Sequence, residues 1–472
     1  MANCGEQCSK LLSIRYIIAV LGSTAMGIIY GLKVNLSVAV VSMVNHTATE
    51  AGSGDHDASG EDGPFIWSGT VQGLLKSAYF WGYIVAQLPA ARIAELVSAK
   101  WVMFFSVAIN VVCTILSPVA ANCHYGVFLL MRILEGVGGG VTFPGMHVLL
   151  ARWAPPAERS VMSSIVYAGT ALGTVIFTLI TGLISSRYGW EAIFYIEGGC
   201  ACIWLIVWTI LASDSPTQHK FISTAERNMI VSSLSEGGSE EKKKLSVPWR
   251  SVLTSRPFLA ILVAHTCCNW GWYMVLIELP HYMSTILKYK IADNAVISSI
   301  PYFTMWLFSM ILSKTLDILR GKEKITTTTA RKISTLIASI VPLVCFLAIC
   351  YSGGDRTLVT VLMTIAITAI GGMFSGYLSN HIDIAPNFAG TLIAITNTCA
   401  TIPGIVVPVF VGELTQSNPT VGSWQIVFWV TIVLYLIASI VYGIFGSGEE
   451  QKWNKQDDTA NESQPLRPIK EA

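Results

Sequence analysis

Charged side chains are scarce in this sequence. Asp, Glu, Lys and Arg make up 12% of its 472 residues, whereas hydrophobic residues make up 53%. The net charge of +1 gives no indication of nucleic-acid binding, and we expect no nucleic-acid partner. The 11 cysteines contain no CxxC pair, so neither a metal site nor a disulfide framework is expected. P-loop, HExxH and GxSxG motifs are also missing, which argues against an enzyme.

Long apolar runs take the place of these motifs. A helix needs about 20 apolar residues to cross the hydrocarbon core of a bilayer, and twelve runs of about that length occur. They lie near residues 16–44, 68–92, 100–120, 124–151, 160–186, 190–212, 257–287, 294–318, 332–351, 357–380, 387–412 and 421–446. The sequence therefore predicts an all-α, multi-pass membrane protein with 12 transmembrane helices.

Lys and Arg are distributed unequally between alternate loops, which indicates the orientation. They cluster after the sixth and eighth runs, whereas the loop at 45–66 has none and holds a glycosylation sequon at Asn45. We therefore predict cytosolic termini and a glycosylated Asn45 on the lumenal or extracellular side. The predicted divisions are a cytosolic N-terminus (1–15), a six-helix bundle (16–212), a cytosolic linker (213–256), a second six-helix bundle (257–446) and a cytosolic tail (447–472).

An internal repeat supports the division into six plus six helices. The turn after the second run holds Glu95 and Lys100, and the turn after the eighth run holds Asp317 and Lys322 at the same spacing. A duplicated bundle with a cytosolic linker is typical of secondary transporters.

Titratable residues inside the apolar runs are candidates for function, because a charge at mid-bilayer costs from about 2.5 kcal/mol upward. Lys33, late in the first run, either faces a cavity or snorkels to the interface. Arg132 and Glu135 are three residues apart and so share one face of the fourth run, and His147 is predicted to lie on the same side. Arg132 and Glu135 either form a self-neutralising structural pair, or Arg132 binds an anion while Glu135 or His147 exchanges protons.

Several stretches resemble the anion:cation symporter family (solute carrier family 17) of the major facilitator superfamily, in particular its sialin-like and type I sodium-phosphate-cotransporter-like members. They are residues 34–40, 80–84, 132–136 with 141–147, 153–160, and 383–386 with 395–398. The resemblance implies the major facilitator fold and alternating access. It also implies that Lys33 and Arg132 bind substrate, that Glu135 and His147 couple it to a cation, and that Glu95, Lys100, Asp317 and Lys322 form gating turns.

Two positions depart from the family pattern. Lys33 stands where family members carry arginine, so the charge is kept but the forked donor is lost. Gly139 stands one helical turn after Glu135, where other members have a second acid. Proton coupling would therefore depend on Glu135 or His147.

We expect symport of a small anion with Na⁺ or H⁺ by a monomeric unit in the lipid bilayer, with no cofactor. The anion is inorganic phosphate, or an organic anion such as sialic acid, another acidic sugar or a carboxylate. The alternative is an anion sensor with the same fold that does not transport. Because the termini lack a complete dileucine sorting signal, the plasma membrane is favoured over lysosomal or vesicular membranes.

Overall fold

The computed structural model describes residues 13–45, 63–67, 69–235, 247–287, 291–353, 355–416 and 420–454. In this part of the chain all the elements are helices, apart from one isolated bridge between Val44 and Phe65. Ten helical segments are long and apolar enough to cross a membrane. Two further helices, α4 (Gly69–Leu96) and α13 (Ile291–Gly321), have similar lengths and pack among them. The prediction of an all-α, multi-pass membrane protein is confirmed.

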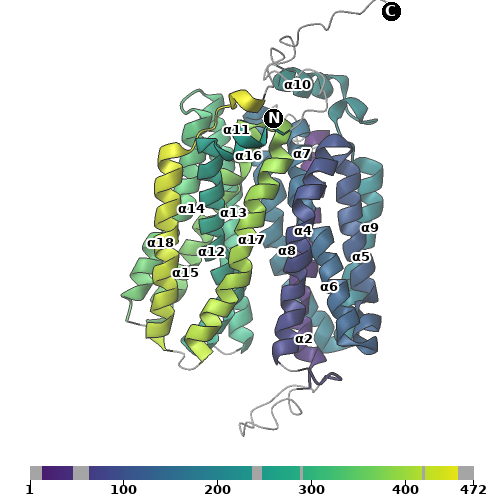
Figure 1. The fold of residues 1–472 in the computed structure, drawn as a ribbon, viewed down its shortest axis with the longest axis vertical. Helices are drawn as coiled ribbons and strands as arrows, with labels where there is room; N and C mark the ends of the chain where they lie inside the picture. Colours follow the sequence, from purple (N-terminus) through teal and green to yellow (C-terminus); the bar gives the residue numbers. More distant parts are fainter. Residues whose placement is uncertain are drawn as a thin grey trace, which may run out of the picture.

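The first half of the chain forms one bundle (Figure 1). It consists of α2 (Ile14–Met43), α4, α5 (Ala99–Cys123), α6 (Tyr125–Gly140), α7 (Thr142–Trp153), α8 (Arg159–Tyr188) and α9 (Trp190–Leu211). Within it α2 packs on α8, α4 on α6, and α5 on both α6 and α9.

The second half repeats this arrangement beside the first (Figure 1). It consists of α12 (Arg256–Thr285), α13, α14 (Thr327–Cys350), α15 (Arg356–Ile370), α16 (Tyr377–Ile384), α17 (Ala389–Gln416) and α18 (Val421–Phe445). The short helices α10 (Thr224–Ser235) and α11 (Trp249–Leu253) lie between the halves in sequence and cap the cytosolic end.

Two predicted spans are interrupted, which the sequence analysis did not anticipate. The fourth breaks at Val141, between α6 and α7, after three consecutive glycines. Pro144 follows, and since proline has no N–H it cannot donate to the carbonyl of Gly140. The tenth breaks between α15 and α16 at a 3₁₀ turn, Gly371–Met373. Residues 380–383 lie beyond this break, within α16.

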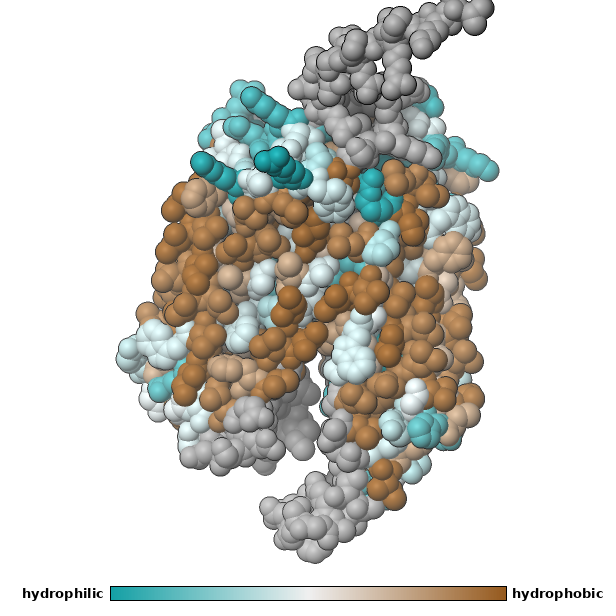
Figure 2. Space-filling view, in the orientation of Figure 1, coloured by the Kyte–Doolittle hydropathy of each residue, from teal (hydrophilic) through white to brown (hydrophobic). Residues whose placement is uncertain are grey.

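The two halves touch through α8 with α13, α4 with α17, and α7 with α17. In the face drawn in Figure 2, apolar residues cover the middle of both halves and hydrophilic residues gather at the upper, cytosolic end. Toward the opposite end a cleft separates the halves. The structure is therefore closed at the cytosolic end and opens between the bundles at the opposite end.

Close packing of α2 on α8 depends on glycine. A side chain at Gly173 would collide with the backbone of Gly27, whereas Gly182, later on the same helix, has open space around it. Small residues allow such close approach of membrane helices.

We predict that Gly173→Val lowers the free energy of unfolding by about 1–3 kcal/mol, because the added methyl groups overpack the interface between α2 and α8. Thermal unfolding of the purified protein in detergent measures the effect. Gly182→Val is the matched control, and an equal loss of stability in both variants would contradict the prediction.

Candidate functional site

Lys33 lies between the two bundles and is surrounded by aromatic rings. Its Nζ is 4.5 Å from the ring centroid of Phe80 and between 5.0 and 5.7 Å from four tyrosine rings. These tyrosines are Tyr30 on α2, Tyr79 and Tyr83 on α4, and Tyr273 on α12. In the described part of the chain no carboxylate lies within ion-pair distance of this amine. The ring faces attract the ammonium group without neutralising its charge.

Arg132, on α6, is fully buried beside this cage. Its guanidinium donates to the backbone oxygens of Leu32 and Lys33, at 3.3 and 3.1 Å, and pairs with Oε2 of Glu135 at 2.5 Å. The other oxygen of Glu135 accepts a hydrogen bond from Thr114 at 3.0 Å. The expected neighbouring pair on one helix face is therefore present, and it is attached to the backbone of the segment that carries Lys33. The Nε of Arg132 has no partner, so the guanidinium keeps one free donor.

Gly139 is explained by Tyr79. The hydroxyl of Tyr79 occupies the space that a Cβ at residue 139 would take, and this buried hydroxyl has no hydrogen-bond partner. An acidic side chain at this position would therefore have to displace a ring of the Lys33 cage.

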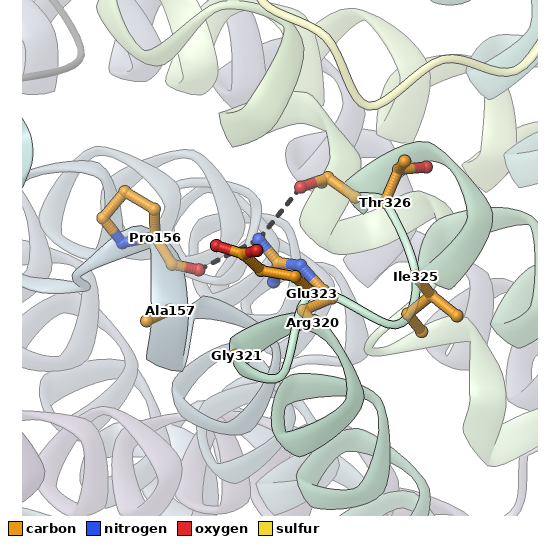
Figure 3. Close-up of a pocket in the computed structure, with 8 residues that line it drawn as sticks. Pro156, Ala157, Arg320, Gly321, Glu323, Ile325 and Thr326 are labelled. Atoms are coloured by element: carbon orange, nitrogen blue, oxygen red, sulfur yellow. Dashed lines mark hydrogen bonds between the residues drawn. The ribbon is translucent and has the colours of Figure 1, made fainter.

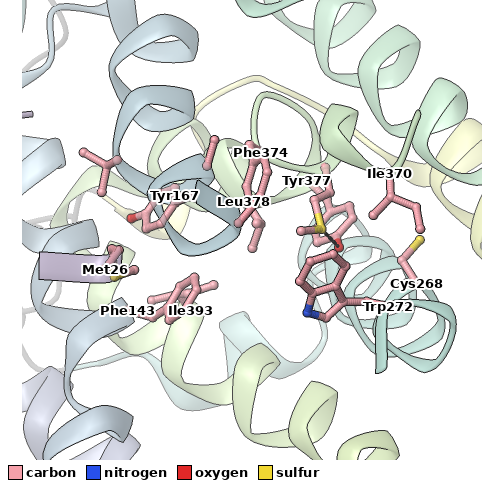
Figure 4. Packing of buried hydrophobic residues seen from close by; sticks show 14 of the residues in the cluster. Met26, Phe143, Tyr167, Cys268, Trp272, Ile370, Phe374, Tyr377, Leu378 and Ile393 are labelled. Atoms are coloured by element: carbon pink, nitrogen blue, oxygen red, sulfur yellow. Dashed lines mark hydrogen bonds between the residues drawn. The ribbon is translucent and has the colours of Figure 1, made fainter. Parts of the chain in front are cut away.

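A small cavity adjoins the cage between the bundles. Tyr30 and Tyr273 belong to the cage and also line the cavity. The polar side chains of Thr170, His265 and Asn269 line the cavity but do not belong to the cage. Apolar residues from both halves pack beside it, among them Phe143, Leu378 and Ile393 (Figure 4). The cavity thus presents hydroxyl, amide and imidazole groups beside the lysine cage.

His147 does not join Arg132 and Glu135. It lies 12 residues after Glu135, on α7, so about 18 Å separates the two positions along the helix axis. Its Nδ1 lies 2.5 Å from the hydroxyl of Tyr167 and 3.0 Å from the backbone oxygen of Phe143. Its Nε2 lies 3.0 Å from the backbone oxygen of Leu378 on α16. His147 therefore connects the two bundles.

Two further histidines adjoin His147. His381 has its ring centroid 5.6 Å from that of His147, and His265 follows at 6.2 Å from His381. Both contact the hydroxyl of Thr396, at 3.1 Å from His265 and 2.8 Å from His381. The sequence analysis missed this cluster because its members lie on α7, α12 and α16, far apart in the chain.

The cytosolic end is held closed by buried ions. Asp383 on α16 accepts from Arg159 of the first bundle at 3.0 Å and from Arg331 of the second at 2.6 Å. Arg331 also donates to the hydroxyl of Ser160, at 2.7 Å. All four side chains are buried. The sequence analysis identified Asp383 only as part of a family motif, without its arginine partners.

The acids of the two repeated turns also reach across the interface. Glu95 accepts from the backbone N–H and the hydroxyl of Thr391, at 2.7 and 2.8 Å. Asp317 accepts from the backbone N–H of Val161 at 2.8 Å. Both contacts therefore join one bundle to the other.

The bases of these turns do not cross the interface. Lys100 donates to Thr209 within its own bundle at 3.0 Å, and Lys322 is exposed. Arg320 takes the bridging position instead, donating to the backbone oxygen of Pro156 at 3.1 Å beside an open cytosolic pocket (Figure 3).

Asn45 follows α2 at the opposite end, where its backbone N–H bonds to Phe65. The remainder of its sequon lies outside the described residues. In the described part of the chain no group of three or more His, Cys, Asp or Glu side chains is arranged to hold a metal ion.

Comparisons with known proteins show the family of this chain. The profile of the Major Facilitator Superfamily matches residues 12–408. Human sialin is 39% identical over 94% of this chain and 92% of its own length. A Drosophila melanogaster protein named for inorganic phosphate cotransport is 36% identical over 96% of this chain and 88% of its own length. Vesicular glutamate transporter 3 of Danio rerio is 35% identical over 95% of this chain and 75% of its own length.

Solved structures share the fold. The proton:xylose symporter XylE superposes with a TM-score of 0.71 and 14% identity, covering 93% of this chain and 98% of that chain. The fucose:proton symporter FucP of E. coli superposes with a TM-score of 0.63 and 12% identity, covering 92% of this chain and 99% of that chain.

We predict that Asp383→Asn opens the cytosolic end. Removing one partner of a buried ion pair costs about 3–5 kcal/mol, and here two arginines would lose their shared carboxylate. Opening of the cytosolic end would let water hydrate the two arginines. The measurement is the labelling rate of Ser164→Cys, a buried position on α8, by a membrane-impermeant thiol reagent in a background without other cysteines.

Asp214→Asn is the control for this experiment, because Asp214 pairs with Arg152 inside a single bundle. Asp383→Asn should accelerate labelling and Asp214→Asn should not. Equal rates in both variants and the parent would show that the Asp383 pairs do not keep the end closed.

Proposed function

Because the chain belongs to the Major Facilitator Superfamily, and within it to the anion:cation symporter family of sialin and the vesicular glutamate transporters, we propose that it is a secondary active transporter for a small anion. The anion is inorganic phosphate or an organic anion such as sialic acid, another acidic sugar or a carboxylate. It moves together with Na⁺ or H⁺ by alternating access, and we propose the plasma membrane as its location.

The uncompensated charge of Lys33 supports this proposal most strongly. Other buried cations near the bundle interface have carboxylate partners, as Arg132 has Glu135 and Arg331 has Asp383. Lys33 has aromatic rings only. A cation held in a site of low dielectric constant without a counter-ion favours an incoming anion. Lys33 is therefore proposed as the primary anion-binding group.

Arg132 is proposed as the second anion-binding group. Its free Nε and its contacts with the backbone of Leu32 and Lys33 support this proposal, because they leave a donor available beside the proposed anion-binding lysine. An anion that draws the guanidinium away from Glu135 would free that carboxylate to accept a proton. The Arg132–Glu135 pair thus provides a physical connection between anion binding and cation binding.

His147 is proposed to connect site occupancy to the closed cytosolic end. The carbonyl oxygens of Phe143 and Leu378 lie within hydrogen-bond distance of its two ring nitrogens. A protonated imidazole could donate to both at once, whereas a neutral ring carries one N–H. Only the proton on Nε2, facing Leu378 on α16, joins the bundles, because Phe143 lies on α7 itself. Loss of that proton would weaken the contact of α7 with α16 and so the state that is closed to the cytosol.

The function is tested with purified protein in liposomes. Uptake of labelled phosphate, sialic acid and glutamate is followed under a pH gradient, a sodium gradient and a membrane potential, each imposed alone. Accumulation of one anion above equilibrium under one of these gradients supports transport. Saturable binding without accumulation under any of them would favour a sensor that does not transport.

We predict that Lys33→Met lowers uptake and counterflow exchange of the transported anion about tenfold or more, because a charge-assisted contact contributes about 1.5–3 kcal/mol. Counterflow requires anion binding but no gradient, so it isolates the binding role. Lys76→Met is the matched control, because Lys76 is an exposed lysine on α4. Normal counterflow in Lys33→Met would refute the assignment.

A further inference from the structure

Glu197 is a buried carboxylate that the proposed site does not use. It lies on α9 with 2% of its surface exposed. Its Oε2 accepts from the side-chain N–H of Asn35 on α2 at 2.9 Å, and its Oε1 accepts from the hydroxyl of Thr181 on α8 at 2.6 Å. Within the described ranges no Lys, Arg or His lies within ion-pair distance of it. A buried acid is thus held by two neutral donors.

The side-chain amide of Asn35 can form a hydrogen bond with either protonation state of Glu197. Its side chain is 1% exposed, and its Oδ1 has no hydrogen-bond partner. Toward the carboxylate the amide presents N–H, as the structure shows. If the amide turned over, the unpaired oxygen could accept a hydrogen bond from a protonated carboxyl. An otherwise unexplained buried acceptor therefore points to proton binding at Glu197.

A short path joins this group to the anion site. Asn35 lies two residues after Lys33 on α2, and the backbone oxygens of Leu32 and Lys33 bind Arg132. The helices packed on α9 are α2, α5 and α8. Thr114 on α5, one of these helices, donates to Glu135, the partner of Arg132. Two of the helices around Glu197, α2 and α5, therefore also contact the Arg132–Glu135 pair.

We propose that Glu197, with Asn35 as its positioning residue, is a proton-binding site that acts together with the Arg132–Glu135 pair and drives anion transport in this protein. One proton adds to the Glu197 carboxylate on the lumenal-open side and leaves from the same oxygen after the bundles change access. The inference rests on the proposed transport function. It supplies the acid that Gly139 cannot.

The donors around Glu197 favour a proton over Na⁺. A sodium ion needs several oxygen ligands turned toward it, but Asn35 and Thr181 both direct hydrogens at the carboxylate. Sodium binding would require both to reorient, whereas proton binding requires only the amide of Asn35 to do so.

The test compares Glu197→Gln with Glu191→Gln, an exposed glutamate on the same helix. Labelled sialic acid, phosphate and glutamate are offered to proteoliposomes with and without a pH gradient. In Glu197→Gln, gradient-driven accumulation should fall at least tenfold while counterflow stays within twofold of the parent protein. Glu191→Gln should retain both. Unchanged accumulation in Glu197→Gln, or loss of counterflow as well, would overturn the proposal, as would accumulation by the parent protein that follows sodium and ignores pH.

Thr181→Val provides a second variant. It removes a donor that stabilises the charged carboxylate, so the pH of half-maximal accumulation should move upward. An unchanged pH of half-maximal accumulation in Thr181→Val would contradict proton binding at Glu197.

An infrared measurement separates this inference from the transport proposal. Difference spectra of the parent protein between acidic and alkaline pH should contain a carboxylic C=O band that is missing from Glu197→Gln and present in Glu191→Gln. If the parent carries none of the three anions but shows this band, the transport function fails while proton binding at Glu197 stands. If the band persists in Glu197→Gln, the proton site is refuted whatever the transport result.

Discussion

The cost of placing charge inside a membrane governs the interior of this protein. An ion removed from water must find a counter-ion, a set of hydrogen bonds or a polarisable surface. The structure uses each solution at a different place. Asp383 has two arginines, Arg132 has a glutamate and two carbonyl oxygens, and Lys33 has five aromatic rings. The kind of compensation distinguishes the closed cytosolic end from the central site. At the closed end each buried arginine contacts a carboxylate, whereas Lys33 in the central site contacts aromatic rings and no carboxylate of the described residues.

The two places are mechanically connected. The contacts that close the cytosolic end, made by Asp383, Asp317 and Glu95, all cross between bundles. His147 crosses the same interface nearer the cavity, through Leu378 on α16. Asp383 lies on that same helix. A change in the contacts of His147 would therefore shift the helix that carries the central carboxylate of the closed end. Through α16, His147 therefore connects the central cavity directly to the contacts that close the cytosolic end.

Much of this organisation follows from the sequence. Hydropathy indicated twelve long helical runs and the all-helical fold, and the three-residue spacing of Arg132 and Glu135 predicted their pairing. The break at Val141 was not anticipated, and neither were the contacts of His147 with Tyr167 and Leu378. The five-ring cage and the three-histidine cluster combine residues from distant helices, and no local pattern identifies such sets. The partners of Asp383 were missed for the same reason. Periodicity reports which face of a helix is apolar, whereas a site between bundles depends on how helices meet.

The resemblance to the family implies a second acid at residue 139, where this chain has Gly139. A side chain there would collide with Tyr79, whose ring belongs to the Lys33 cage. The position that would hold an acid and the ring that surrounds the anion-binding lysine therefore compete for the same space. With the ring in place, a second acid can remain in the network only from another helix. Glu197 meets that requirement, because it approaches the α2 segment that carries Lys33 from α9, where no part of the cage lies. The aromatic cage thus excludes an acid at residue 139 but leaves room for the acid on α9.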